Sequence, residues 1–344
     1  MSRTTFDRAD RVRGRRAGRS RRALAGLAAL ALLAVTAACS GPDGQSDLGR
    51  TPEPTATASA EPTTAPTTAA PAECADPTQS YDPLATLPAA GAMPSGSTMA
   101  EIADRGQLIA GVSADTLLMG ARNPFTGAIE GFDIDVVRDI STAIFGDPDH
   151  VQYRVITSGQ RLQALQDGTV DVVARTFSVT CARWAEIAFS AVYFQAGQKL
   201  LVSADSPVQG FDDLAPDTRV CAPSGTTTLT RLEEYDVEAV PAATHTECLA
   251  LFQQGQVDAI TGDDTILAGF AAQDPYASVV GAAISAEPYG VGIAADDVDL
   301  VQFVNAVLAQ RVADGRWQAS YDRWLAPALG AGTGAPTPVY GRTP

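Results

Sequence analysis

Short apolar runs alternate with amphipathic helical patterns from residue 98 to residue 330, and this alternation is the strongest constraint on the fold. Leu108 to Val112 is typical of a buried strand, whereas Phe132 to Phe145 places its apolar residues at helical spacing. Alternation of this kind predicts an α/β fold with mainly parallel sheets. Further strands are predicted at 151–156, 170–173, 219–221, 239–240 and 257–260, and helices at 160–166, from 226, from 247, from 264 and over 301–325.

One short unit occurs twice. Leu165 to Val173 has the sequence Leu-Gln-Asp-Gly-Thr-Val-Asp-Val-Val, and Phe252 to Ile260, 87 residues later, has Phe-Gln-Gln-Gly-Gln-Val-Asp-Ala-Ile. Each contains the end of a helix, a glycine suited to a helix C-cap and a strand that starts with Val-Asp. Any helix-to-strand loop can take this form. Two such units nevertheless favour two similarly built lobes.

The N-terminus has the pattern of an export signal. An arginine-rich stretch is followed by an Ala/Leu run from Ala23 to Ala38 and then by Cys39. This order is typical of a signal peptide, which we assign to residues 1–38, because the apolar run is short for a membrane-spanning helix of about 20 residues. Thr36-Ala37-Ala38-Cys39 resembles a lipoprotein lipobox, with Thr36 where that motif has Leu, so Cys39 is the expected lipidation site. A single anchor helix and the export route remain open.

Residues 39–97 are expected to contain the lipidated cysteine, a disordered tether and an irregular lead-in. From residue 40 to about 72 the chain is mostly Thr, Pro, Ala, Ser and acidic residues, which bury too little apolar surface to offset chain entropy. Proline keeps such a tether extended. The tail, 331–344, is rich in Gly, Pro and Thr and is also expected to be disordered. The expected location is the extracytoplasmic face of the cell membrane, through the lipid anchor.

The chain is strongly acidic, with a formal charge of −16. Residues 1–38 hold nine arginines and two aspartates, so the remainder carries −23. Nucleic-acid binding requires clustered Lys and Arg, whereas this remainder is acidic and Lys199 is the only lysine of the chain. Nucleic acid is therefore not expected as a partner.

Cysteine usage points to disulfides rather than to a metal site. Apart from Cys39, the chain has Cys74, Cys181, Cys221 and Cys248. An even number of cysteines in an exported chain favours two disulfides. The sequence allows three connectivities, of which we prefer Cys221–Cys248 together with Cys74–Cys181. None of the spacings is typical of a zinc site, and no metal site is predicted.

Several motifs resemble the polar amino acid-binding proteins of ABC importers, which are bacterial extracellular solute-binding proteins of family 3. Each motif is weak alone, but their order and spacing over residues 100–328 are specific. Cys181, Arg122-Asn123-Pro124 and Asp263-Asp264 further resemble glutamate/glutamine-binding lipoproteins of actinobacteria. The motifs are Gly111 to Asp115, Gly131 to Asp135, Thr157 to Arg161, Ser178 to Arg183, Phe189-Ser190 with Tyr193, Ser224 to Thr227 and Val257 to Asp263.

The resemblance implies a periplasmic-binding-protein-like α/β fold, in which two doubly wound lobes joined by two hinge strands close around a ligand. The first lobe would comprise 98–193 and 291–330, and the second 198–285. Hinges are expected near 194–197 and 286–289. The implied function is capture of a polar amino acid and its delivery to an ABC transporter permease, by a monomer that needs no cofactor.

A zwitterion needs hydrogen-bond donors at its carboxylate and an anion at its ammonium group. Arg183 occupies the family's carboxylate-binding position, with the hydroxyls of Thr176 and Ser178 beside it. Arginine suits this role because its planar fork donates two parallel hydrogen bonds. The alternative interpretation of Arg183 is a solvated helix residue.

By resemblance, the second lobe completes the site with Thr226 and Thr227 at the carboxylate and Asp263 at the ammonium group. Each of these residues would also suit a helix cap. Asp115 ends the first strand, at the edge where α/β sheets place ligands, and by resemblance it also reaches the ligand. Leu118 stands where relatives often carry an aromatic residue over the ligand.

Selectivity for the ligand side chain is less constrained. Arg122, Arg161, Arg175 and Lys199 are candidate partners for a side-chain carboxylate. Arg175 is preferred because it is a charge at the end of an apolar strand, beside the Arg183 motif. A salt-bridged strand end would look the same in sequence. Glutamate, aspartate, glutamine and asparagine all remain open as ligands.

Two other functions compete with transport. An enzyme, such as a dehydratase of this fold, would need a placed acid or base. His150 and His245 are the only histidines and neither accompanies a nucleophile motif, so no catalytic residue is assigned. A sensor that signals amino acid availability to a membrane partner would use the same lobe closure. The sequence does not distinguish it from a transport protein.

Overall fold

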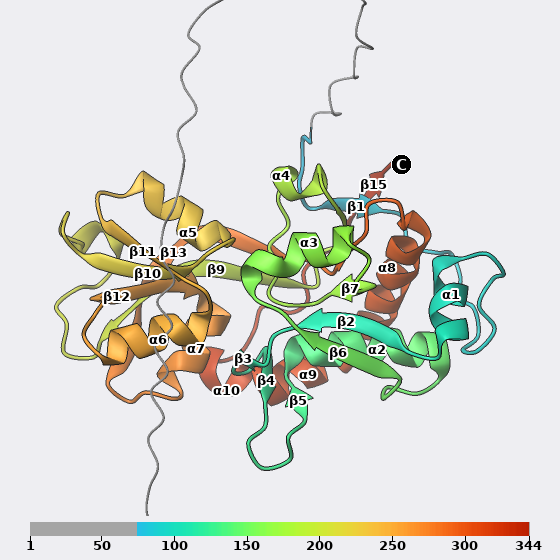
Figure 1. Cartoon of the computed structure of the whole chain (residues 1–344), viewed down its shortest axis with the longest axis horizontal. Helices are drawn as coiled ribbons and strands as arrows, with labels where there is room; N and C mark the ends of the chain where they lie inside the picture. The colour runs from blue at the N-terminus through green and yellow to red at the C-terminus, as the bar shows by residue number, and fades with distance from the viewer. Residues whose placement is uncertain (1–73, 344) are drawn as a thin grey trace, which may run out of the picture. The chain divides into compact units, whose positions relative to one another are not determined.

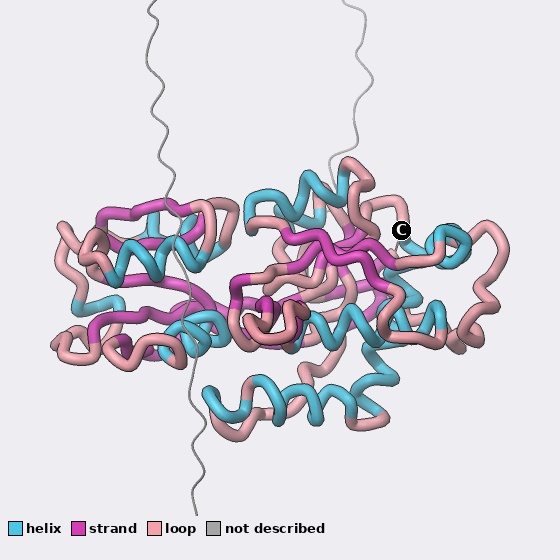
Figure 2. The backbone as a smooth tube through the Cα atoms, turned by 60° about the horizontal axis from the view of Figure 1, so that its bottom comes forward, coloured by secondary structure: helices cyan, strands magenta, loops and turns pink. Residues whose placement is uncertain are grey.

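A computed structural model describes residues 74–343 of the chain. The expected signal peptide over 1–38, the lipidation site Cys39 and the tether up to residue 73 lie outside the described residues. Two five-stranded sheets dominate the described part (Figures 1 and 2). Each sheet forms the centre of one lobe, so the predicted two-lobe α/β fold is confirmed.

The first lobe is built on the sheet with strand order β6-β2-β7-β14-β8. β6, β2 and β7 are parallel, and β14 runs antiparallel to both β7 and β8. A small antiparallel sheet, β3-β4-β5, follows β2. The strands are β2 (Leu108–Val112), β3 (Asp115–Thr116), β4 (Gly120–Arg122), β5 (Ile129–Glu130), β6 (Val151–Val155), β7 (Val172–Val173), β8 (Ala188–Phe189) and β14 (Gly292–Ile293). The helices are α1 (Thr98–Arg105), α2 (Phe132–Phe145), the 3₁₀ turn η1 (Ser158–Gln160), α3 (Arg161–Gln166), α4 (Cys181–Trp184), α8 (Val298–Ala313), α9 (Arg316–Trp324) and α10 (Ala326–Leu329).

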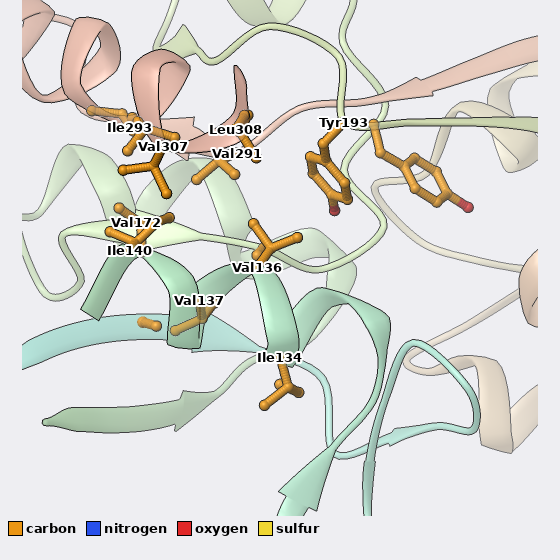
Figure 3. Packing of buried hydrophobic residues seen from close by; sticks show 14 of the residues in the cluster. Ile134, Val136, Val137, Ile140, Val172, Tyr193, Val291, Ile293, Val307 and Leu308 are labelled. Carbon is orange, nitrogen blue, oxygen red and sulfur yellow. The ribbon is translucent and has the colours of Figure 1, made fainter. Parts of the chain in front are cut away.

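The core of the first lobe forms around α2, whose bounds are those predicted from the sequence. Gly146 ends the helix in the left-handed conformation, with φ +78°, that glycine adopts without strain. Figure 3 shows the apolar face of α2 packed among strand and helix residues of the same lobe. The residues labelled there are Ile134, Val136, Val137, Ile140, Val172, Tyr193, Val291, Ile293, Val307 and Leu308.

The second lobe is built on the sheet β11-β10-β12-β9-β13, whose first three strands are parallel. Val220, Cys221 and Ala222 are consecutive and all fully buried, because neighbouring side chains enter apolar clusters on opposite faces of the sheet. The strands are β9 (Phe194–Ser203), β10 (Arg219–Pro223), β11 (Glu238–Ala242), β12 (Ala259–Asp263) and β13 (Ala277–Tyr289). The helices are η2 (Phe211–Asp213), α5 (Thr227–Arg231), η3 (Leu232–Glu234), α6 (His245–Gln253) and α7 (Asp264–Ala271).

β9 and β13 connect the two lobes. They pair antiparallel from Phe194 and Tyr289, beside the first lobe, to Ser203 and Ala277 in the second (Figure 1). The register shifts between Val280 and Ser285. The segments 194–197 and 286–289, predicted to be the hinges, therefore lie hydrogen-bonded to each other where the two strands leave the first lobe.

Two expectations need correction. The tail is not disordered throughout, because β15 (Val339–Arg342) pairs in parallel with β1 (Gln79–Tyr81) of the lead-in. The helical pattern over 301–325 is not one helix but two, α8 and α9. They separate at Gly315, whose φ of +83° no helix accommodates.

Both disulfides of the preferred pairing are present. Cys74–Cys181 ties the lead-in to α4, and Cys221–Cys248 ties β10 to α6 within the second lobe. The Cα atoms of each pair are 5.5 Å apart.

Among residues 74–343, no helix has the length and apolar character needed to cross a bilayer.

Replacing Phe132 tests the core of the first lobe. Its side chain is fully buried, with the Phe194 ring 5.4 Å and the Trp317 ring 5.8 Å away between centroids. We expect Phe132→Ala to lower the free energy of unfolding by about 3–5 kcal/mol, measured by urea denaturation, because a cavity replaces the ring. The control is Phe125→Ala, since Phe125 is 95% exposed and should change stability by less than about 0.5 kcal/mol. Equal losses for both variants would contradict this core.

Candidate ligand-binding site

A small polar cavity lies between the two lobes. Its volume is about 10 Å³, which is room for about one water molecule, so a larger ligand enters only when the lobes separate. First-lobe residues form one wall and second-lobe residues the other. The lining residues are Arg161, Thr176, Ser178, Thr226, Thr227, Thr228, His245, Asp263 and Ile266.

Arg161 reaches across this cavity. Its guanidinium is buried, donating from Nε to the Ser158 carbonyl (2.8 Å) and from Nη1 to the Thr176 carbonyl (3.0 Å). From Nη2 it donates to the Gly225 carbonyl of the second lobe (3.0 Å). Burial, followed by the charges of Arg183 and Arg175, lowers the pKa of Arg161 well below its ordinary value. The first lobe thus presents a concentrated positive charge to the second.

Arg183 converges on the same oxygen. It projects from α4, donates from Nη1 to the Ser178 carbonyl (2.5 Å) and from Nη2 to the Gly225 carbonyl (3.1 Å). Both guanidinium carbons lie over the Phe177 ring, that of Arg161 at 4.3 Å and that of Arg183 at 5.0 Å from the centroid. Two cations therefore share one neutral acceptor, an arrangement that strongly favours an incoming anion.

The second lobe meets these cations through a tight turn. Gly225 lies between β10 and α5 with φ +75°, and a Cβ atom there would come within 2.7 Å of the Gly159 Cα of the first lobe. Thr226 caps α5, with its Oγ1 accepting from the Leu229 amide (3.1 Å). Only glycine allows the two backbones to approach so closely.

The second lobe contributes a buried carboxyl group, that of Asp263 at the end of β12. Its Oδ2 accepts from the Tyr289 hydroxyl (2.6 Å), whereas Oδ1 is buried and has no hydrogen-bond partner among the described residues. Burial, reinforced by the charge of Glu287, raises the pKa of Asp263 to about 8. Glu287 is itself buried, accepting from Thr227 Oγ1 (2.7 Å) and from Ser285 Oγ (2.8 Å). At pH 7 the Asp263 carboxyl is therefore mostly protonated, and a cation that enters the cavity would favour its ionised form.

His245, which the sequence reasoning did not place in the site, also lines the cavity. It is the first residue of α6 and is buried, and its Nδ1 has no partner among the described residues. Burial, followed by the charge of Arg175, lowers its pKa to about 3, so the imidazole is neutral at pH 7. The one available signal was its position just after β11, at the sheet edge that also carries Asp263.

The predicted residues fall into two groups. Thr176, Ser178, Thr226, Thr227 and Asp263 line the cavity, and Arg183 contacts the Ser178 and Gly225 carbonyls at its edge. The remaining three do not line the cavity: Asp115, Leu118 and Arg175.

Arg175 and Asp115 instead support the site from behind. Arg175 is 1% exposed, donates from Nε to the Ile156 carbonyl (2.7 Å) and from Nη1 to Ser158 Oγ (2.6 Å), and its Nη2 lies 3.9 Å from Asp115 Oδ1. Asp115 also accepts from Thr246 Oγ1 through its carbonyl (3.3 Å), which is a contact between the lobes.

Leu118 borders a larger cleft of about 760 Å³ on the hinge side. Its φ of +77° turns the chain there. That cleft is lined mostly by apolar and small side chains, together with Lys199 and Asp264. We place the site in the small cavity because buried arginines of the first lobe and the buried Asp263 carboxyl of the second lobe meet there. The described residues contain no group of His, Cys, Asp and Glu that could hold a metal ion.

Comparison with known proteins identifies the family. The bacterial extracellular solute-binding proteins of family 3 match residues 108–327. The ABC transporter glutamine-binding protein GlnH of Bacillus subtilis is 35% identical over 230 residues, which are 66% of this chain and 84% of GlnH. The glutamate-binding protein GluB of Corynebacterium efficiens is 32% identical over 258 residues, 71% of this chain and 86% of GluB.

The chain belongs to this family. Among solved structures, an ancestral amino acid-binding protein, described as a precursor of cyclohexadienyl dehydratase, is similar to this member of family 3, with 29% identity and a TM-score of 0.60. The similarity covers 66% of this chain and 99% of that one. The solute-binding role predicted from the sequence is confirmed.

The raised pKa of Asp263 predicts a pH dependence of stability. A carboxyl whose pKa is about 8 in the folded protein and has the ordinary value of 3.8 in the unfolded chain stabilises the fold fully below about pH 4 and loses this contribution as the pH rises through 8. Asp263→Asn should therefore gain stability relative to the natural protein, by a few kcal/mol at pH 8 and by little at pH 4.

The measurement is urea denaturation of both proteins across this range without added ligand. The difference between the two isolates Asp263 from other titrating groups, among them Asp133, whose pKa burial raises to about 6. A stability difference that does not change with pH would refute this assignment.

Proposed function

We propose that this solute-binding protein captures a polar amino acid, with an acidic side chain preferred, by closing its lobes and delivers it to an ABC transporter permease. One observation carries the proposal. Arg161 and Arg183 of the first lobe meet at a single carbonyl, while Asp263 of the second lobe holds an unpartnered carboxylate oxygen in the same cavity. Such walls complement the two charges of a zwitterion.

Each wall would take one end of the ligand backbone. Arg183 would donate its fork to the α-carboxylate, and the cavity-lining Thr176 and Ser178 would add donors beside it. Asp263 would accept from the ammonium group, whose charge lowers the carboxyl pKa and restores the carboxylate. Because these groups come from both lobes, the ligand stabilises the closed form over the open one.

Arg161 and His245 would select the ligand side chain. Arg161 replaces Arg175 as the preferred partner, because Arg161 lines the cavity whereas the donors of Arg175 already contact Ile156, Ser158 and Asp115. A guanidinium favours a side-chain carboxylate over an amide, since a hydrogen bond to a charged group is about twice as strong. The GlnH and GluB relatives are named for glutamine and glutamate, which have side chains of the same length.

Calorimetric titration of the purified protein with glutamate, aspartate, glutamine and asparagine tests this function. We expect micromolar or tighter binding of an acidic amino acid or its amide. Arg183→Ala should weaken binding by at least about 100-fold, because a buried charge loses its partner. Arg161→Met should reduce glutamate affinity by about 10-fold or more and glutamine affinity less.

The matched control is Arg122→Met, which removes an exposed guanidinium on the β4 strand, outside the cavity. It should leave all four affinities unchanged. Tight binding that survives Arg183→Ala would mean that the site lies elsewhere.

We also propose that the protein binds without catalysing a reaction. The curated relatives described above are named as binding proteins. In the site proposed here, His245 and the Asp263 carboxylate would contact the ligand. A turnover assay with prephenate-like acids and the four amino acids would reveal an enzyme of this fold. Signalling to a membrane partner would use the same closure, but no observation favours it over transport.

Finally, we propose that the mature protein is a monomer held at the extracytoplasmic face of the membrane by a lipid on Cys39. The lipobox-like sequence before Cys39 supports this location, as does the extracellular character of the family. Cys39→Ala should move the protein from the membrane fraction to the soluble fraction, since stable anchoring requires the attached acyl chains. Fractionation with immunodetection measures this, with Cys221→Ala as a cysteine control. Membrane association of Cys39→Ala would show that anchoring does not require this residue.

A further inference from the structure

The helix that carries Arg183 is too short to be stable alone. α4 has four residues, one turn, and isolated helices this short are unstable in water. Cys181 and Trp184 are three residues apart and share one face, whereas Arg183 points to the other side. The Thr180 cap of α4 and the Ser178 carbonyl hold Arg183 locally, and beyond these contacts its orientation toward the cavity depends on what contacts Cys181 and Trp184.

The lead-in covers that face. Cys181 forms a disulfide with Cys74, and the Trp184 Nε1 donates to the Pro77 carbonyl (2.8 Å). Both ends of the single turn are thus attached to a segment that precedes the family match, which begins at residue 108.

The C-terminal tail completes the attachment. The Arg342 guanidinium carbon lies 3.8 Å from the centroid of the Trp184 ring, and its Nη2 lies 3.9 Å from Cys74 Sγ. Its Nε donates to the Gln79 carbonyl (2.8 Å), beside the ladder of β1 and β15. Arg342 therefore contacts α4 and the lead-in at once. We call the two segments that make these contacts, residues 74–81 and 339–342, the clasp.

The clasp is fixed to the body of the first lobe. Ser80 Oγ donates to the Phe189 carbonyl of β8 (2.8 Å). The buried Asn305 of α8 donates from Nδ2 to Ser80 Oγ (2.9 Å) and to the Tyr81 carbonyl (2.8 Å). Movement of the clasp relative to the sheet would break buried hydrogen bonds. The clasp is therefore held in place and can hold α4 in place in turn.

We propose that the clasp positions Arg183 and thereby sets the affinity of the site for its ligand, with Arg342 as the positioning residue that acts through Trp184. None of the clasp residues lines the cavity. The inference rests on the proposed function, because it assumes that Arg183 binds the ligand carboxylate. It also makes the affinity dependent on the Cys74–Cys181 disulfide.

The test compares Arg342→Ala, Arg342→Lys and the double variant Cys74→Ser, Cys181→Ser. The dissociation constant for L-glutamate and L-glutamine is measured at a temperature at which circular dichroism shows each protein to be fully folded. We expect Arg342→Ala to weaken binding about twofold to fivefold, the size of a cation–π contact, and Arg342→Lys to restore most of the loss. The double cysteine variant should lose more.

The matched control is Arg323→Ala, which removes another arginine stacked on a tryptophan, at 4.4 Å over Trp324, away from α4. It should leave affinity unchanged. Unchanged affinity in the fully folded Arg342→Ala and double cysteine variants would overturn the inference. The clasp would then only stabilise the fold. If the cysteine variant does not fold, the comparison of Arg342→Ala with Arg342→Lys decides whether the inference holds. Failure of the natural protein to bind either amino acid would instead refute the proposed function.

Discussion

Two buried guanidinium groups that share one carbonyl oxygen are the constraint around which this protein is arranged. Arg161 and Arg183 lie together over Phe177, and the Gly225 carbonyl between them carries no charge to balance theirs. Desolvated cations are costly unless an anion meets them. The surroundings of this pair offset that cost. The Gly225 turn of the other lobe contacts the pair, the Asp263 carboxyl lies on the opposite wall, and other residues support each arginine from behind.

The support behind Arg161 is a residue that sequence reasoning placed in the site itself. Arg175 donates to the Ile156 carbonyl and to Ser158, so it holds the turn from which Arg161 extends, and its remaining charge faces Asp115. The charge at the end of this apolar strand therefore lies beside the proposed site and does not line its cavity. Which of two nearby arginines enters the cavity depends on side-chain directions that only the folded chain fixes.

The fold follows from local patterns more completely than the site does. The spacing within Phe132 to Phe145 predicts α2 with its observed bounds, because a helix face repeats every few residues. The β1–β15 ladder pairs Gln79 with Val339. No local pattern in a Gly/Pro/Thr-rich tail predicts a strand partner so distant in the sequence. His245 was missed for a related reason, since a lone histidine acquires a role only when folding brings charged neighbours around it.

The contact of Gly225 with Gly159 limits how far the lobes can approach each other. Backbone meets backbone there, with no flexible side chain between to compress or rotate. In this arrangement the cavity beside the contact has a volume of only about 10 Å³, so the glycine contact and a bound amino acid exclude each other. The contact therefore marks the limit of closure of the empty site, and an occupied site has its lobes further apart by an amount that the length of the ligand sets.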